Sequence, residues 1–174
     1  MTEPELSRTV RADTLGGTPR AMHVQAGPQE REALARRFGI AGVESLEAEL
    51  DVARAGGEVV ARGRIVAAVV QSCVVTGEPV PERIDEAFEI HFRPEPAADA
   101  EEEIELGEGE LDVIFYDGAL VDLGEAVAQT LALNLDPYPR APGAADALRQ
   151  AGVQDESEAG PFGALASLKE KLSK

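Results

Sequence analysis

The sequence predicts an α+β fold in which a mostly antiparallel sheet, curved or partly closed into a barrel, packs against two helices. Alternating apolar and polar residues indicate about five strands, and two further segments show helical spacing and capping residues. Tryptophan is absent and aromatic residues make up only 4% of the 174 residues, so the core must consist of Val, Leu, Ile and Ala. We expect one domain over residues 1–143, followed by a flexible C-terminal tail over residues 144–174.

The first predicted elements are a strand and a short helix. The strand begins within "LSRTV", residues 6–10. Residues 29–38 are predicted to be helical because Pro28 stands at the first turn, acids come early, arginines come late and glycine follows as a stop. Leu34 and Phe38 lie four residues apart and therefore share the face that docks this helix.

A β-hairpin is predicted next. Apolar residues alternate with acids over residues 46–52, which is typical of a half-buried strand. "AGG" at 55–57 predicts the turn. Residues 58–73 begin with one polar face and become apolar on both faces, so we expect this strand to run from an exposed end into a covered centre.

A third long strand follows a turn at 76–79. Its apolar row is interrupted by Glu86, which places the start of the strand near Ala87. Residues 94–110 are rich in Pro, Ala, Gly and Glu, and this composition predicts a flexible acidic loop.

One more strand and a second helix complete the predicted domain. "LDVIFY" is a strand that ends at the turn formed by Asp117 and Gly118. Residues 122–133 fit a helix in which Asp122 is the cap and Glu125 completes an acidic capping box. The apolar rows of these elements are expected to be buried: Leu46, Leu50, Val52, Ile65, Val69, Cys73, Phe88, Ile90, Val113, Phe115, Val127 and Leu131.

The charge is strongly and unevenly negative. The formal net charge is −17, and between Arg93 and Arg140 there are 13 acids and no Lys or Arg. Nucleic-acid affinity depends largely on cations that neutralise phosphates, so this segment is suited to a basic protein partner instead. The alternative is that these acids simply solvate a loop.

The single cysteine, Cys73, decides whether enzymatic or metal chemistry should be considered. A zinc site needs about four ligands, and His23 and His91 lie far apart in the sequence. His91 falls on the polar face of its strand, so pairing it with Cys73 as a catalytic base would need a slipped register. A small buried side chain is the favoured role, because unpaired cysteines are often buried.

Other features likewise favour a non-catalytic protein. No phosphate-binding loop, dinucleotide fingerprint or nucleophile elbow is present. We expect no cofactor and no metal. One cysteine, the lack of a signal sequence and the lack of a long apolar run indicate a cytoplasmic protein that does not enter a membrane.

Several motifs resemble those of the YceD family, named for large ribosomal RNA subunit accumulation, in its alphaproteobacterial branch. The similarity spans roughly residues 5–174 and is strongest over 65–80 and 112–143. The matching positions are Cys73, which takes the place of the first cysteine, Asp122, Leu123 and Glu125 in "DLGE", and Asp136, Pro137, Tyr138 and Pro139. Many relatives have Cys-x-Arg-Cys, whereas this chain lacks the arginine and the second cysteine, so a metal or redox role of that pair does not apply.

The resemblance implies a small non-catalytic protein that supports production or stability of large-subunit ribosomal RNA. We expect Thr76, Gly77 and Pro79 to set a turn whose segment forms a surface groove with "LDPYPR", and Cys73 to be structural. The acidic segment would then bind a basic ribosomal protein or a large-subunit assembly intermediate.

Two alternatives remain open. Arg36, Arg37, Arg62 and Arg64 could contact RNA directly as a basic patch, although interleaved aromatic residues for base stacking are lacking. The protein could also be an adaptor unrelated to ribosomes, since family members are often encoded beside fatty-acid synthesis genes as well as a large-subunit ribosomal protein.

Overall fold

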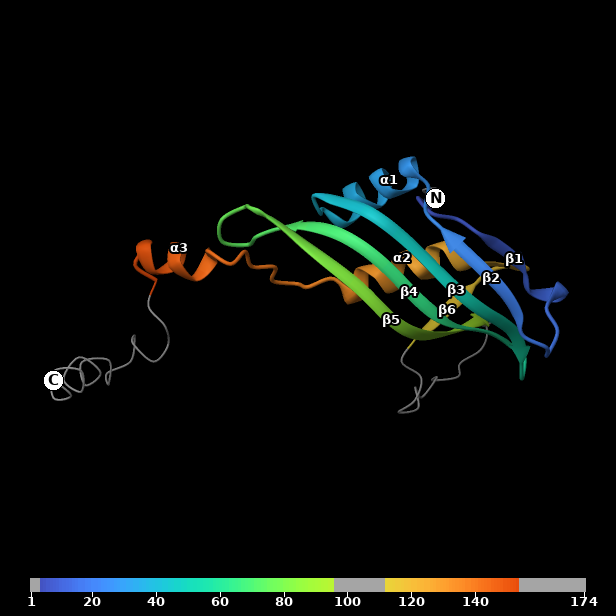
Figure 1. Ribbon diagram of the computed structural model, residues 1–174. Coiled ribbons are helices and arrows are strands. Elements are labelled where there is room, and N and C mark those ends of the chain that lie inside the picture. The colour runs from blue at the N-terminus through green and yellow to red at the C-terminus, as the bar shows by residue number, and fades with distance from the viewer. Residues whose placement is uncertain (1–3, 96–111, 154–174) are drawn as a thin grey trace, which may run out of the picture. The chain divides into compact units, whose positions relative to one another are not determined.

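The computed structural model describes residues 4–95 and 112–153 and divides the chain into two compact units. The first unit comprises Met1–Gln71 and Pro81–Asp136, and the second comprises Ser72–Val80 and Pro137–Lys174. Figure 1 labels the elements of both units. The domain predicted for residues 1–143 and the tail predicted for residues 144–174 stay predictions.

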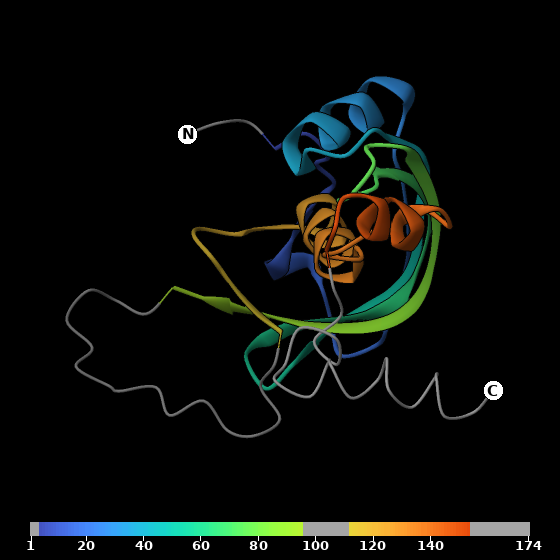
Figure 2. The same ribbon diagram turned by 90° about the vertical axis from the view of Figure 1, so that its left-hand side faces the viewer.

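A five-stranded sheet forms most of the first unit. Its strands are β2 (Arg20–Gln25), β3 (Gly42–Ala55), β4 (Glu58–Ser72), β5 (Pro79–Pro94) and β6 (Val113–Tyr116), in the order β2-β3-β4-β5-β6. The pairs β2–β3 and β3–β4 are antiparallel, whereas β5–β6 is parallel. The sheet is curved (Figure 2) and has β2 and β6 as its edges in the described part of the chain, so it is the open form of the predicted architecture.

The remaining elements are short. β1 (Thr9–Arg11) and β7 (Leu120–Asp122) form a separate two-stranded antiparallel sheet, and a 3₁₀ turn, η1 (Ala12–Thr14), follows β1. The helices are α1 (Pro28–Phe38), α2 (Leu123–Asn134) and α3 (Ala144–Gln150), the last in the second unit.

The two predicted helices are confirmed, and their ends have simple causes. In α1 the Glu30 carboxylate accepts a hydrogen bond from the Gly27 backbone N–H at 2.7 Å. The helix stops at Gly39, whose φ of 65° is favourable for glycine alone among common residues. α2 lies in the concave side of the curved sheet (Figure 2), where its apolar face meets the strands.

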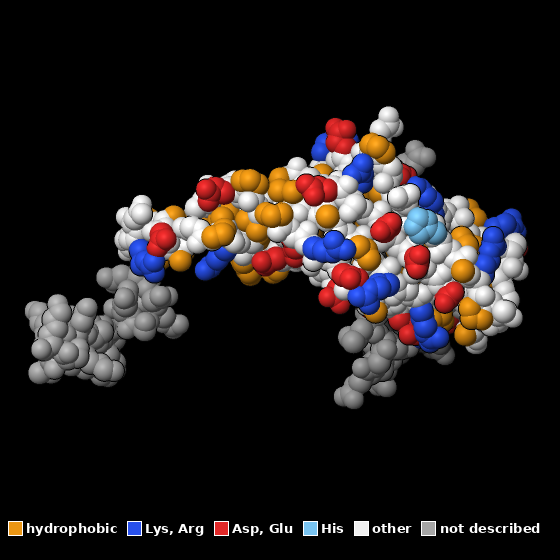
Figure 3. Space-filling model, in the orientation of Figure 1, with side chains coloured by type: hydrophobic (Ala, Val, Ile, Leu, Met, Phe, Trp, Pro, Cys, Tyr) orange, Lys and Arg blue, Asp and Glu red, His pale blue; other side chains and the backbone are white. Residues whose placement is uncertain are grey.

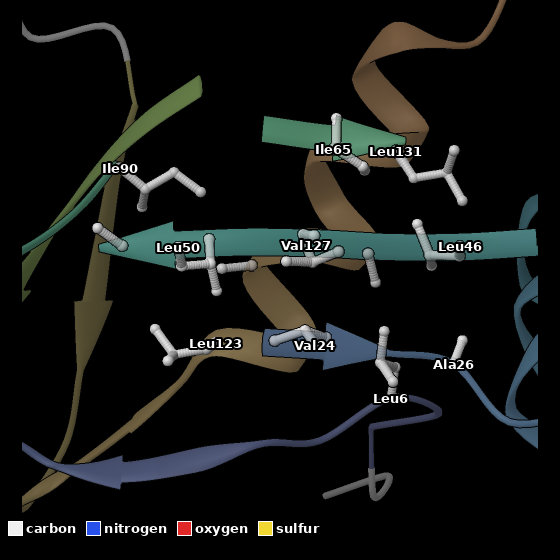
Figure 4. Packing of buried hydrophobic residues seen from close by; sticks show 14 of the residues in the cluster. Leu6, Val24, Ala26, Leu46, Leu50, Ile65, Ile90, Leu123, Val127 and Leu131 are labelled. Atoms are coloured by element: carbon white, nitrogen blue, oxygen red, sulfur yellow. The ribbon is translucent and has the colours of Figure 1, made fainter. Parts of the chain in front are cut away.

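The core of the first unit lies between α2 and the inner face of the sheet. Figure 4 shows Val127 and Leu131 of α2 beside Leu46, Leu50 and Ile65 of the central strands. The predicted core residues that are buried in this unit are Leu46, Leu50, Val52, Ile65, Val69, Ile90, Val127 and Leu131. Sequence reasoning missed Leu6 and Val24, which are also buried here.

The predicted burial is wrong in β6. Phe115 is 43% exposed, while its neighbours Ile114 and Tyr116 pack against the core. Every residue of "VIFY" is apolar or aromatic, so the sequence pattern leaves open which alternate set faces inward. Val113 and Phe88 are half-buried rather than buried.

β5 begins earlier than predicted, at Pro79 instead of near Ala87. Glu86 has the inward parity of Ile84, Phe88 and Ile90 but is exposed. The strand therefore continues past Glu86 because the inner side of the sheet is open to solvent at that point.

Two expectations concern segments near the ends of the described residues. The flexible acidic loop at 94–110 lies almost entirely outside them, and so do residues 154–174 of the predicted tail. The start of that tail contains α3. Within the described residues, no helix is both long enough and apolar enough to cross a bilayer.

Candidate functional site

The second unit brings the "CVVTGEP" turn together with the proline stretch. The Val74 backbone N–H donates to the Pro139 carbonyl at 2.9 Å. Cys73 packs in a small buried cluster with Ala141 and Ala144. Tyr138, in contrast, is largely exposed. The two segments that the sequence singled out are therefore in contact, while the surface groove between them stays a prediction.

The turn itself is held by backbone hydrogen bonds around the cysteine. The Cys73 N–H donates to the Glu78 carbonyl at 2.7 Å, and the Cys73 carbonyl accepts from the Gly77 N–H at 2.9 Å. Gly77 has a φ of 75°, a conformation that side-chain-bearing residues rarely adopt. Pro79 follows as the first residue of β5. These contacts explain why a glycine stands at position 77.

Cys73 is 4% exposed, in agreement with a buried role, but its thiol is surrounded by donors. The Thr76 hydroxyl and the backbone N–H groups of Ala141, Thr76 and Val75 lower the pKa of the Cys73 thiol to about 6, because each donor stabilises the thiolate. The Thr76 hydroxyl also lies 3.0 Å from the Glu78 carboxylate. Thiolate and carboxylate thus compete for one hydrogen.

In the first unit, the "DLGE" motif attaches the N-terminal segment to the start of α2. The Asp122 carboxylate accepts hydrogen bonds from Ser7 Oγ at 2.6 Å and from the Arg8 N–H at 2.8 Å, as well as capping α2 at the Gly124 N–H at 2.9 Å. The Leu123 N–H donates to the Arg8 carbonyl at 3.0 Å, and its side chain is buried. Asp122 is therefore the predicted cap, with a second structural role.

The acidic capping box predicted at α2 is wrong. Glu125 does not reach back to the cap residue, because its carboxylate accepts two hydrogen bonds from Arg37 of α1, at 2.6 and 2.8 Å. Arg37 also lowers the pKa of Glu125, and Glu125 in turn raises the pKa of Arg37. The interaction ties α1 to α2, two helices that are far apart in the sequence.

The other predicted site residues of the first unit form a turn and a helix exit. Asp117 and Gly118 lie between β6 and β7, and Gly118 has a φ of 76°. The Asp136 N–H donates to the Glu82 carboxylate at 3.2 Å, and its carbonyl accepts from the Gln71 side chain at 3.0 Å. These residues thus serve local structure within the first unit.

The four arginines considered for RNA contact are all paired with carboxylates. Arg36 pairs with Glu32 on α1, and Arg37 pairs with Glu125 and Glu5. On the sheet, Arg62 pairs with Glu89 at 2.7 Å and Arg64 pairs with Asp85 at 2.6 Å. Arg36 and Arg37 lie on α1, whereas Arg62 and Arg64 lie on β4, so the four arginines do not share one element.

The outer face of the sheet carries acids and bases side by side (Figure 3). His91 lies between two carboxylates, with Nδ1 2.9 Å from Glu58 and Nε2 3.0 Å from Glu89. Glu58, and then Glu89, raises the pKa of His91 because both stabilise the imidazolium. Arg62 and then His91 lower the pKa of Glu89 to about 2. Glu58, Glu89, Arg62 and His91 therefore form a network of paired charges.

A cavity with a volume of about 780 Å³ lies in the first unit between β5, β6 and α2. Phe88 and Ile90 line it from the sheet, Asp112 from the start of β6, and Thr130 and Leu133 from α2. Leu133 is 79% exposed.

A family model described as "Large ribosomal RNA subunit accumulation protein YceD" matches residues 61–169. This match spans well over half of the 174 residues. The chain belongs to the YceD family. No curated protein and no solved structure matches it.

The YceD match begins within β4 and includes the cysteine turn, β5, β6, α2 and α3. It therefore covers the sequence of the second unit up to residue 169 and the β5–α2 cavity, whereas α1, β2 and β3 precede it. The family description implies a role in accumulation of the large ribosomal RNA subunit. Among the residues that the structure describes, no cluster of three or more His, Cys, Asp or Glu side chains is arranged to hold a metal ion.

Proposed function

We propose that this YceD-family chain is a non-catalytic cytoplasmic factor that supports accumulation of large-subunit ribosomal RNA by binding a basic ribosomal protein or assembly factor. The chain has 33 acids against 16 bases, and the arginines that would be needed for an RNA surface are used within the protein. The pairing of Arg36, Arg37, Arg62 and Arg64 with carboxylates is the observation that most supports this proposal.

The physical basis of this proposal is the balance between positive and negative side chains that are available to a partner. An exposed arginine that already has a carboxylate partner offers little net positive potential to a phosphate. The stretch between Arg93 and Arg140, in contrast, carries 13 acids and no base. A field of this sign attracts basic polypeptides and speeds their association, and salt weakens both effects.

In this mechanism the protein holds a basic partner until the partner is transferred to ribosomal RNA. Ribosomal RNA has a higher density of negative charge than any protein segment, so the transfer is favourable once the RNA is near. No bond is made or broken, and no cofactor is needed.

The test is a tagged pull-down from gentle lysate at low and high salt, with and without RNase. We expect a basic ribosomal protein or assembly factor that remains bound after RNase treatment and is lost at high salt. Recovery of large-subunit precursor RNA that disappears with RNase would instead support direct RNA binding. Recovery of neither would favour an adaptor unrelated to ribosomes.

A matched pair of charge reversals tests where the partner is attracted. Glu101, Glu102 and Glu103 are changed to lysine in one variant, and Asp155, Glu156 and Glu158 in the other, so that both variants change the net charge equally. We expect the first to abolish capture and the second to retain it. Equal retention by both variants would refute capture by the acidic stretch.

A further inference from the structure

Three residues that lie far apart in the sequence are joined by hydrogen bonds at the end of β4. The Gln71 side-chain amide donates to the Glu82 carboxylate at 2.7 Å and to the Asp136 carbonyl at 3.0 Å. The Glu82 carboxylate also accepts from the Asp136 N–H, at 3.2 and 3.4 Å to its two oxygens. Both backbone groups of Asp136 are therefore bound by side chains of the neighbouring strands β4 and β5. We call these three residues the latch.

The burial of Gln71 makes the latch favourable. Gln71 is only 7% exposed and continues the buried odd-numbered row of β4 after Ile65 and Val69. Burying a side-chain amide is costly unless its polar groups are hydrogen-bonded. If the Asp136 carbonyl moved away, one of the two bonds that the Gln71 amide donates would be lost at a buried position. The end of β4 therefore favours the conformation in which Asp136 is bound.

Asp136 is the first residue of a segment that we call the strap, residues 136–141. Proline stands at positions 137 and 139, and proline has no backbone N–H, so the strap cannot pair with a neighbour as a regular strand. Its residues are exposed except Pro139 and Ala141, which are buried. Because the strap buries little of its own surface, polar contacts such as those of Asp136 are important for holding it in place.

The far end of the strap covers the cysteine turn. Ala141 packs against Cys73, and its backbone N–H donates to the sulfur. The Val74 N–H donates to the carbonyl of Pro139 at 2.9 Å. In contrast, the bonds from the Cys73 N–H to Glu78 and from the Gly77 N–H to Cys73 lie within the turn itself. The turn can therefore keep its own bonds when the strap is released.

We infer that the strap opens and closes over the cysteine turn as a local conformational step, and that the latch of Gln71, Glu82 and Asp136 holds it closed. In the closed state the strap covers the Cys73 sulfur and accepts from the Val74 N–H. In the open state both groups are accessible, while the core of the first unit stays intact. The latch thus controls access to a turn that lies within the family match. The inference is independent of the proposed function, because it does not depend on the nature of any partner.

The first experiment measures amide hydrogen exchange by NMR in the full, unmodified chain. The Asp136 and Val74 amides have acceptors that depend on the closed strap, whereas the Cys73 and Gly77 amides are bonded within the turn. After correction for intrinsic rates, we expect the first two to be protected equally and less strongly than the other two. Equal protection of all four amides would mean that strap and turn open only together, which would overturn the inference.

Two variants test whether the latch holds the strap. Gln71→Leu removes the amide, and Glu82→Ala removes the carboxylate that accepts from it. We expect each variant to speed exchange at Val74 by about five- to thirtyfold, as expected for the loss of one or two hydrogen bonds, with no change at the turn amides. Glu86→Ala is the matched control, because Glu86 is an exposed acid on the same strand. Unchanged exchange at Val74 in both latch variants would contradict the role of the latch.

Cys73 serves as an independent reporter of the open state, because it is the single cysteine of the chain. Its reaction with dithionitrobenzoate is followed by absorbance in increasing, low concentrations of urea. We expect a rate that hardly changes with urea, since a local opening exposes little surface, and that rises in Gln71→Leu and Glu82→Ala but not in Glu86→Ala. A rate that rises with urea as steeply as global unfolding would show that Cys73 is exposed only when the protein unfolds.

A loss of global stability in a variant can be recognised separately. The Val69 amide lies in the core part of β4, and its exchange should stay as slow in the latch variants as in the unmodified chain. Faster exchange at Val69 and Val74 alike would show that a variant unfolds as a whole. In that case the exchange pattern of the unmodified chain decides whether the strap opens on its own.

Discussion

At the scale of single residues, Cys73 combines burial with an environment that stabilises negative charge. Its side chain is 4% exposed and packs against two alanines, as expected for a small core residue. The donors around the sulfur nevertheless favour the thiolate. Cys73 is the single cysteine of the chain, so the charge on its sulfur is not shared with a second thiolate.

The first prediction concerns the ionisation of this thiol. Titrating the intact protein while following the ultraviolet absorbance of the thiolate should give a midpoint near pH 6, and Thr76→Val should raise that midpoint because the leading donor is lost. Cys73→Ser, which has no thiolate, should show no such step. A midpoint close to that of a free thiol would contradict the proposed role of these donors.

The ionisation of Cys73 also makes the stability of the protein depend on pH. The pKa of the folded thiol is below that of an unfolded one, so the stabilisation is fully present above about pH 9 and is lost as pH falls toward 6. Comparing the pH dependence of unfolding between the native chain and Cys73→Ser isolates this contribution.

The second prediction concerns Gly124 in the "DLGE" motif. A Cβ atom at this position would lie 2.7 Å from the Leu6 carbonyl oxygen and 2.8 Å from the Arg8 nitrogen. We expect Gly124→Ala to destabilise the protein by about 1–3 kcal/mol, although alanine is the better helix former. Gly42→Ala is the control, since a Cβ there meets nothing within 4 Å. Stabilisation by Gly124→Ala in chemical denaturation would show that the N-terminal segment does not pack this closely.

At the scale of elements, local patterns predicted most of the secondary structure but not the pairing of the last strands. The helix at 29–38 and the β3–β4 hairpin follow from capping residues, alternation and the "AGG" turn. The parallel pairing of β6 with β5 could not be predicted, because nothing in "VIFY" specifies its neighbour or its buried face. β2 was missed since "RAMHVQ" is only six residues long and gains its place by pairing with β3.

The candidate site was predictable to a similar degree. The contact between the cysteine turn and the proline stretch joins segments that the sequence had already singled out. The cavity beside β5 was missed because it depends on how α2 lies against the sheet. The partner of Glu125 was also missed, since Arg37 belongs to a helix 88 residues away in the sequence.

The third prediction concerns the ion network of β4 and β5. Both ring nitrogens of His91 lie within hydrogen-bond distance of carboxylates, and both can donate only when the ring is charged. In an NMR titration the pKa of His91 should lie above that of a free histidine, and Glu58→Gln should lower it because the Glu58 contact is the largest cause. Glu47→Gln, on the neighbouring β3, should leave it unchanged.

The raised pKa of His91 determines how the stability of the protein changes with pH. The contribution of His91 is fully present below the pKa of an unfolded histidine, about 6.5, and is lost as pH rises through the higher folded value. If the pKa of His91 lay below that of a free histidine, the two carboxylate contacts would not exist in solution.

At the scale of the whole molecule, the important property is how the charges are distributed. Arg62, Arg64 and Arg93 of β4 and β5 meet acids at short distances, so these arginines present little net positive charge to a partner. The acids without basic neighbours determine the field at longer range. The molecule therefore presents net negative charge to a partner, and the four arginines considered for RNA contact are paired with carboxylates.

The fourth prediction follows from this distribution. Changing Arg62 and Arg64 to glutamine removes the arginine partners of Glu89 and Asp85 and leaves Glu89 with His91, so affinity for a labelled basic peptide should increase and should remain sensitive to salt. Binding of a labelled RNA oligonucleotide, measured by fluorescence anisotropy in the same buffers, should be weak in both proteins. RNA binding by the native chain that disappears in the double variant would support the arginine-patch alternative.

The attachment of the N-terminal segment to α2 also determines when the protein can finish folding during its own synthesis. Ser7 and Asp122, which are in hydrogen-bond contact, are 115 residues apart. At a translation rate of about 5–20 residues per second, Ser7 is made roughly 6–23 s before its partner. The β2–β3–β4 meander has local contacts and is able to form in that interval. Its inner apolar rows remain uncovered until α2 leaves the ribosome, and during this time the nascent chain is most exposed to aggregation and most dependent on chaperones.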